Sequence, residues 1–407
     1  MQKNFSYYLL LLIVFLVPTQ LSYHPWPAYS FVSGQPIDYL SPAIYLVDLL
    51  ILIYLSIHVK NIWQIIKNNF LNNKFKLIIC ILIFALINII FSQVPLIALY
   101  AWTKTLLTLL LGVIVYVNFQ QHSSKSLLNM FYISLAIFGL LAVLQFASGT
   151  SVGGVWSIFG ERPLLLSNPQ VAKSIVSGSL LLRPYSTFPH PNALSGFALI
   201  ALVITLTKIE KYKLPISLLI SGLILITQSR STIILATIFI CYWVYQIVDK
   251  RTSKKILSKA LVIIFGLVAL FMTSQFSPLT FSKSLKQRND QIKITTELIL
   301  VNPLIGSGLN NYLVVLEAAG KSHITGLQPV HNIPLLILTE IGLFGIGLIL
   351  IVAYSFRNQL INNKPLMLLL VCVVITAQID HYWVTSHQNF LLLVLLPTLC
   401  LNAKHHS

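Results

Sequence analysis

The sequence contains little charge and few acids. Only 9% of its 407 residues are charged, and just 10 are Asp or Glu. Soluble domains carry about 25% charged residues. Hydrophobic residues make up 56% of the chain, and the mean hydropathy is +0.83. Apolar runs close to the roughly 20 residues that cross a bilayer recur along the whole length. The composition therefore excludes an ordinary soluble domain and predicts an integral membrane protein.

Several other features are missing. The four cysteines, Cys80, Cys241, Cys372 and Cys400, all fall in apolar runs, which argues against a disulfide framework or a zinc site. No internal repeat or low-complexity linker stands out, so one domain spanning 1–407 is the simplest interpretation. No small-residue cleavage site closely follows residues 1–22, so a retained first span is expected there in place of a signal sequence.

The apolar runs predict an all-α fold of about 12 transmembrane helices. The expected spans are 7–22, 40–59, 77–92, 96–117, 127–147, 192–207, 214–228, 231–248, 256–275, 333–354, 365–380 and 388–402.

Basic residues predict how these spans are oriented, because Lys and Arg stay on the cytoplasmic side. Most of the 27 basic residues fall on one side if twelve spans alternate. Both termini are then cytoplasmic, and 23–39, 148–191, 276–332 and 380–387 face outward. The net charge of +17 is scattered through short loops beside spans, so nucleic-acid binding is not expected.

Two outward loops, 148–191 and 276–332, are unusually long for a compact bundle. Structureless loops of this length are usually functional. Within the second loop, 290–301 is expected to form a short interfacial helix, with Ile294, Leu298 and Val301 on its apolar side. Asn302-Pro303 would end that helix.

The outward face, including the short turn between the seventh and eighth spans, carries basic groups that the topology rule does not explain. These groups are Arg162, Lys173, Arg183, Arg230, Lys283, Lys286, Arg288, Lys293 and Lys321. They favour a site for an anionic ligand, since the guanidinium fork suits phosphate oxygens. Arg230 in "TQSRSTII" lies at the start of a span, where helix N–H groups also attract anions. The alternative for Arg230 is a side chain that snorkels to lipid headgroups.

The stretch "VHNIPLLILTE" begins the tenth span, with Asn332 as a plausible N-cap. His331 would lie at the outer interface, where a neutral imidazole can accept a proton from a sugar hydroxyl. The alternative is an interfacial histidine without a chemical role. Glu340 lies about 12 Å deeper at 1.5 Å per residue. It is expected either to orient the surroundings of His331 or to form a structural ion pair with an arginine. Asp380 and His381, in the last outer loop, are expected only to support the site.

Four motifs occur in a fixed order: "RPYSTFPHPNALSGF" at 183–197, "SRSTIILA" at 229–236, "NPLIGSGLNNY" at 302–312 and "HNIPLLILTEIGLFG" at 331–345. Together they resemble the bacterial O-antigen ligase/polymerase superfamily over about 183–350. The resemblance implies a metal-independent glycosyltransferase of the cytoplasmic membrane, without a cofactor. Its active site would face the extracytoplasmic side. Its partners would be a polyprenyl-diphosphate-linked glycan, an acceptor glycan or glycolipid, and the bilayer.

The resemblance also implies site residues. Arg230, Arg288 and His331 match the catalytic positions. Arg183, His190 and Asn192 match an earlier loop motif expected to bind substrate, and Asn332 and Glu340 complete the candidate substrate-binding set. No Asp-x-Asp pair occurs in the outward segments, so no metal is expected.

The sequence leaves two rival functions. A transporter or flippase would place polar groups near the bilayer midplane on broken helices, whereas charge here gathers at one face. The other rival is a non-catalytic assembly protein. Ligase and polymerase activity are not distinguished by the sequence, because loop shape selects the acceptor.

Overall fold

The computed structural model describes residues 2–69, 73–118, 124–168, 170–176, 179–209, 211–248, 266, 278–322 and 326–400. These residues are mostly helical. The helices are α1 Gln2–Leu16, α2 Leu46–Ile57, α3 Val59–Asn69, α4 Asn73–Ile90, α5 Pro95–Val117, α6 Ser124–Ser148, α7 Val155–Ile158, α8 Pro191–Lys208, α9 Lys213–Thr227, α10 Arg230–Val248, α12 Pro278–Val301, α13 Tyr312–Ala318, α15 Ile333–Ser355, α16 Arg357–Asn362, α17 Lys364–Ala377, α18 Tyr382–Thr385 and α19 His387–Cys400.

Short antiparallel strand pairs complete the fold. They pair β1 (Ser22–Tyr23) with β4 (Ile44–Tyr45), β2 (Phe31–Val32) with β3 (Gln35–Pro36), and β5 (Lys173–Val176) with β6 (Ser179–Leu182). The longest pair is a hairpin in which Lys173 lies opposite Leu182.

Every predicted span except 256–275 overlaps a helix, although 7–22 and 40–59 each extend about six residues beyond α1 and α2, and 256–275 lies outside the described residues apart from residue 266. Among the described residues, 4 helices are long and apolar enough to cross a membrane: α5, α6, α8 and α15. The number rises to 5 if the pair α2–α3, bent by 61°, counts as one span. The structure thus supports an all-α membrane fold, while the count of twelve spans stays a prediction.

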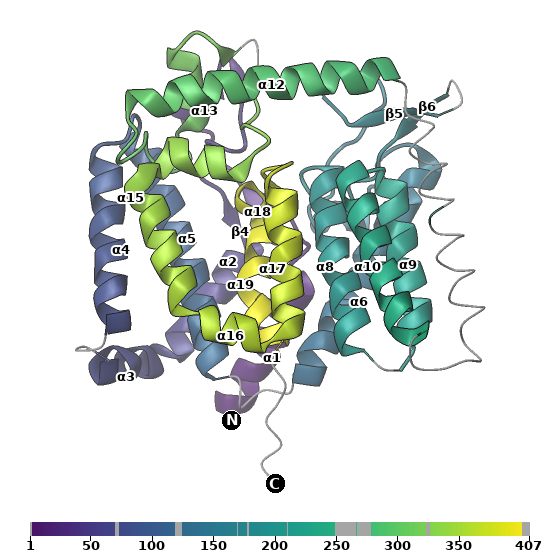
Figure 1. Ribbon diagram of the computed structural model, residues 1–407, viewed down its shortest axis with the longest axis horizontal. Helices are drawn as coiled ribbons and strands as arrows, with labels where there is room; N and C mark the ends of the chain where they lie inside the picture. The colour runs from purple at the N-terminus through teal and green to yellow at the C-terminus, as the bar shows by residue number, and fades with distance from the viewer. Residues whose placement is uncertain are drawn as a thin grey trace.

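Most helices run side by side, and α12 lies across one end of the bundle (Figure 1). We call this the α12 end; α3 and α16 lie at the opposite end. The helix α12 is longer than the interfacial helix predicted over 290–301, but it ends at Val301 as expected. Ile294 and Leu298 pack into a core cluster with α13 and α15, whereas Val301 is exposed.

The centre of the bundle is α8, which is buried along almost its whole length. Small residues on this helix allow close packing, as is common between helices in membranes. A Cβ built on Gly196 would lie 2.4 Å from the Tyr382 ring, so only glycine leaves room for that ring. The Tyr382 side chain therefore fixes the segment after α17 against α8.

The helix α15 is broken at Gly342, where φ is 62° and ψ is −170°. Backbone groups freed in lipid need protein partners, and residues 303–308 supply them. Ser307 N donates to Thr339 O at 2.9 Å, and Leu343 N donates to Pro303 O at 2.9 Å. The segment that follows α12 is thereby docked into the break in α15.

Candidate active site

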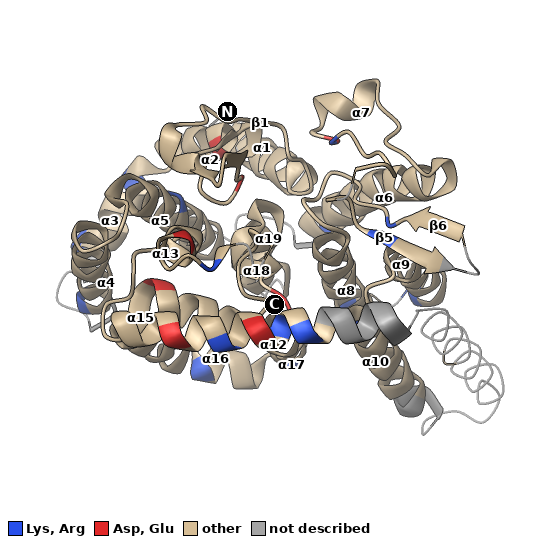
Figure 2. Cartoon of the chain, turned by 90° about the horizontal axis from the view of Figure 1, so that it is seen from above, with Lys and Arg blue, Asp and Glu red and all other residues tan. Residues whose placement is uncertain are grey.

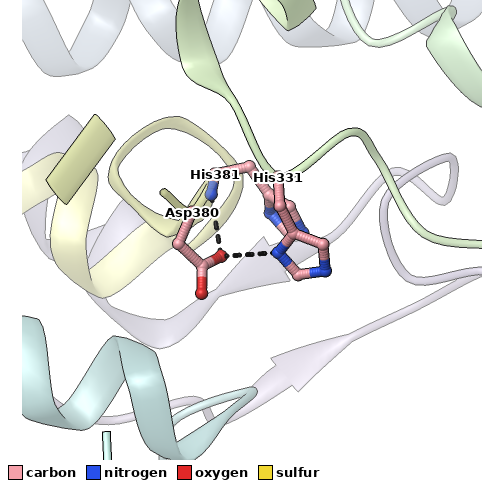
Figure 3. A group of neighbouring side chains, drawn as sticks. All are labelled: His331, Asp380 and His381. Atoms are coloured by element: carbon pink, nitrogen blue, oxygen red, sulfur yellow. Dashed lines mark hydrogen bonds and ion pairs between the residues drawn. The ribbon is translucent and has the colours of Figure 1, made fainter. Parts of the chain in front are cut away.

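A buried carboxylate lies at the α12 end of the bundle, beside two histidines (Figure 3). Asp380 and His381 occupy the short link between α17 and α18, and His331 comes just before α15. The Nδ1 atom of His331 lies 3.3 Å from Oδ1 of Asp380, and the other ring nitrogen points away from the carboxylate. The rings of His331 and His381 are 5.0 Å apart.

Asp380 is the most connected group of the site. Its Oδ1 accepts the backbone N–H of His381 at 2.8 Å, and its Oδ2 accepts Nδ2 of Asn192 at 2.7 Å. Burial alone would raise the pKa of Asp380. The hydrogen bond with His331 and the nearby imidazoles outweigh burial and hold this pKa well below its usual range. Asp380 is therefore an anion at neutral pH.

Asn192 is placed by the start of α8. Pro191 occupies the first turn, where its missing N–H is no loss. His190 is the N-cap, and its Nδ1 accepts the backbone N–H of Asn192 at 3.1 Å. Burial first, and then the charge of Arg183, lower the pKa of His190 to about 3. A neutral imidazole is the form that can accept this bond.

Arg183 follows strand β6 and turns into the protein. Its Nε donates to the backbone oxygen of Thr227 at 2.9 Å, and its Nη2 donates to Oδ1 of Asn192 at 2.6 Å. Burial lowers the pKa of Arg183 to about 10, partly offset by Tyr185 and Asp380. The guanidinium therefore stays protonated at neutral pH.

The other two predicted arginines belong to the same electrostatic environment. Arg230 is the first residue of α10, after a turn in which Gln228 is left-handed with φ 54°. The charge of Arg288, on α12, acts on both Arg230 and His381. The charges of Arg183 and Arg230 also act on each other. Figure 2 shows α12 crossing the α12 end between α15 and α10.

Hydrogen bonds therefore connect Arg183, His190 and Asn192 to Asp380, which lies beside His331. The charge of Arg230 acts on Arg183, and that of Arg288 acts on His381. Asn332 lies beside them as the N-cap of α15. Its Oδ1 accepts Leu335 N at 3.0 Å, and its Nδ2 donates to the backbone oxygen of Gln378 at 3.2 Å. Asn332 thus ties α15 to the end of α17, two residues before Asp380.

Glu340 has different partners. Its Oε1 accepts the Tyr39 hydroxyl and lies 3.4 Å from the backbone N of Tyr312. Tyr312 begins α13 directly after the docked segment. Among the described residues, the side chain of Glu340 contacts Tyr39 and Tyr312 and makes no hydrogen bond or ion pair with His331 or an arginine. Glu340 therefore belongs to the packing around the break in α15.

The ligand atoms of His331, Asp380 and His381 lie within 4.8 Å of one another, a spacing that could hold a metal ion. The existing hydrogen bonds favour another use. Both oxygens of Asp380 already accept N–H donors, and His381 Nδ1 lies 2.7 Å from Oγ1 of Thr385. The arrangement suits a carboxylate that orients a histidine, which is a common way to prepare a general base.

The sequence did not indicate some of these contacts. The backbone oxygen of Thr227 and that of Gln378 carry no side-chain signal. Asp380 was expected only in support, and its direct contact with His331 depends on the fold. The available signal was "QIDHYW" at 378–383, an acid and a histidine between two apolar spans, because buried charge in a membrane protein is usually functional.

Residues 215–350 match the O-antigen ligase family, which confirms the predicted resemblance to the O-antigen ligase/polymerase superfamily. The matched range contains Arg230, Arg288 and His331, whereas Arg183, Asn192 and the other residues outside it are not covered. No curated protein and no solved structure matches the chain. The apolar helices support a membrane protein, and the matched range relates its C-terminal half to polysaccharide assembly.

Proposed function

Because residues 215–350 match the O-antigen ligase family, we propose that the chain is a membrane glycosyltransferase. It would move a glycan from a polyprenyl-diphosphate carrier to an acceptor sugar at the extracytoplasmic face of the cytoplasmic membrane. The observation that carries the proposal is the pair of His331 with the buried Asp380, next to groups on which the charges of Arg230 and Arg288 act.

The donor would bind through Arg230 and Arg288. Breaking a sugar–diphosphate bond builds negative charge on the leaving oxygen, and preorganised guanidinium groups stabilise such charge. Both side chains lie at the α12 end, and their charges act on each other. A diphosphate between them would relieve the repulsion between two like charges, so the site is suited to an anion.

The acceptor would be activated by His331. With the proton of Nδ1 directed at Asp380, the lone pair of Nε2 is available to a sugar hydroxyl. The acceptor oxygen attacks the anomeric carbon, the bond from that carbon to the diphosphate oxygen breaks, and the hydroxyl proton passes to Nε2. Polyprenyl diphosphate leaves with the electron pair of the broken bond. Asp380 stabilises the imidazolium that forms.

The acceptor can be of two kinds within this chemistry. A ligase passes the glycan to a glycolipid core sugar, and a polymerase passes it to another lipid-linked repeat unit. Both reactions use the same attack of a hydroxyl on a glycosyl diphosphate, so the same residues serve either one.

The test uses purified protein in proteoliposomes with a polyprenyl-diphosphate-linked oligosaccharide and either acceptor. Wild type should release polyprenyl diphosphate and lengthen or glycosylate the acceptor, and Arg230→Ala and His331→Ala should lose most of both signals. Arg357→Met is the matched control, because Arg357 is exposed on α16 at the end opposite the site, and its Nη1 donates to the backbone oxygen of Tyr354 at 3.0 Å. Movement of intact glycan across the bilayer without bond cleavage would favour a transporter and refute the proposal.

A further inference from the structure

A continuous chain of hydrogen bonds connects the turn before Arg230 to His331. It begins at the backbone oxygen of Thr227, which accepts Nε of Arg183 at 2.9 Å. Nη2 of Arg183 donates to Asn192 at 2.6 Å, and Asn192 donates to Asp380 at 2.7 Å. Asp380 then lies 3.3 Å from Nδ1 of His331. We call these links the Arg183 relay.

We propose that Arg183 and Asn192 are positioning residues that hold Asp380, and through it His331, in the geometry for transfer. The inference rests on the proposed glycosyltransferase function, and it gives Arg183 a different role from a substrate-binding arginine. Arg183 acts on the reaction through Asn192 and Asp380.

The directions of the bonds support this role. Two nitrogens of Arg183, Nε and Nη2, lie in one rigid guanidinium plane and donate to two protein oxygens on different elements. The Asn192 amide then has its oxygen turned to Arg183 and its nitrogen to Asp380, so each group in the chain fixes the orientation of the next. A guanidinium used in this way has fewer donors left for a diphosphate than one that faces the substrate.

The relay also joins the two halves of the site. Thr227 is the last residue of α9, and the turn after it ends at Arg230. Arg183 therefore holds the turn that carries the proposed donor arginine together with the carboxylate that orients the proposed base. Displacing catalytic groups by about 1 Å can cost about 100-fold in rate, so one shared support makes both groups sensitive to Arg183.

The experiment compares Arg183→Met, Asn192→Leu and Arg230→Met in proteoliposomes. Arg183→Met and Asn192→Leu should each lower kcat about 10- to 100-fold. Their KM for the lipid-linked donor and their Kd for glycan-free polyprenyl diphosphate should change less than about 3-fold. Arg230→Met should instead raise both constants by about 10-fold or more. The variant Arg183→Met/Asn192→Leu should be no slower than the slower of the two single variants, because both changes break one chain.

Arg357→Met is again the matched control, and each variant is first shown to retain a cooperative thermal transition. A Kd for polyprenyl diphosphate that rises in Arg183→Met as much as in Arg230→Met would overturn the relay, because it would make Arg183 a phosphate ligand. Multiplicative losses of kcat in the double variant would also overturn it.

Failure of the proposed function gives a different result. If wild type releases no polyprenyl diphosphate, that function is refuted, and the relay is judged by thermal unfolding of the same variants. The relay then predicts that Asn192→Leu lowers Tm in the wild-type background and lowers it little further in Arg183→Met. Additive losses of Tm would overturn it.

Discussion

Replacing Asp380 by Asn tests the Asp–His pair with almost no change in shape. In wild type both carboxylate oxygens accept N–H groups, from Asn192 on one side and from His381 and His331 on the other. An amide can offer only one oxygen, so in Asp380→Asn one side must place N–H against N–H. If the amide nitrogen faces His331, the imidazole is held with its proton on Nε2, where the acceptor needs a lone pair.

The expected loss follows from these contacts. A general base contributes about 10²- to 10⁴-fold to rate, so kcat of Asp380→Asn should fall within that range. An unsatisfied buried donor costs about 1–3 kcal/mol of folding free energy, so Tm should also fall. The assays are polyprenyl diphosphate release at saturating donor and thermal unfolding in detergent. Asp38→Asn is the matched control, since Asp38 is exposed and pairs only with Arg162 among the recorded ion pairs of the described residues.

The double variant Asp380→Asn/Asn192→Asp separates stability from chemistry. The carboxylate that it introduces at position 192 can still accept from Arg183, and the second oxygen of that carboxylate can accept from the new amide at position 380. The amide oxygen then remains free for His381 and His331. Tm should return most of the way to wild type, whereas kcat should stay at least about 10-fold low because the anion is one residue further from His331. An Asp380→Asn protein that folds and keeps more than about a third of wild-type kcat would refute the assignment of His331 and Asp380.

Three further outcomes are expected. Gly196→Val should lower the free energy of unfolding by about 1–3 kcal/mol, because the new side chain meets the Tyr382 ring. The control is Gly222→Val, where nothing lies within 4 Å of the added Cβ. Equal Tm values for the two variants would contradict the packing of Tyr382 on Gly196. EDTA should change the rate of glycan transfer less than about 2-fold, whereas Zn²⁺ should inhibit transfer by binding the imidazoles of His331 and His381. Loss of transfer in EDTA that Zn²⁺ restores would instead indicate a metal enzyme. Acidification should destabilise the fold: burial lowers the pKa of His190 to about 3 and that of His381 to about 4, from 6.5, so the unfolded chain binds more protons below pH 6.5. Each histidine then removes about 1.4 kcal/mol per pH unit down to its folded pKa, and His381→Asn should flatten the fall of Tm between about pH 6.5 and 5.

Much of the fold was predictable because hydropathy acts locally along the chain. The long apolar runs gave helices close to the expected ranges, and Asn302-Pro303 marked the end of α12. The full length of α12 was not expected. The predicted helix covered only its C-terminal half, where the described apolar side chains Ile294 and Leu298 are buried.

Local sequence also predicted some residues of the candidate site and missed the contacts between distant ones. Arg230, Arg288 and His331 lie in motifs with recognisable neighbours, so their residue types and order were enough to select them. The bond between Asn192 and Asp380 joins residues 188 positions apart, and no local pattern encodes such a pair. Its geometry depends on Tyr382 packing against Gly196, which places the link after α17 beside the start of α8.

Glu340 shows why a buried acid is hard to interpret from sequence alone. Within an apolar run it suggests a partner of opposite charge, because an unpaired carboxylate in lipid is costly. The break at Gly342 changes that expectation: it lets the docked segment approach, and Glu340 accepts from Tyr39 and lies 3.4 Å from Tyr312 N. The same segment continues directly from α12. An acid deep in the bundle therefore helps to hold the helix that carries Arg288 across the α12 end, and its influence on the site passes through the backbone of residues 302–311.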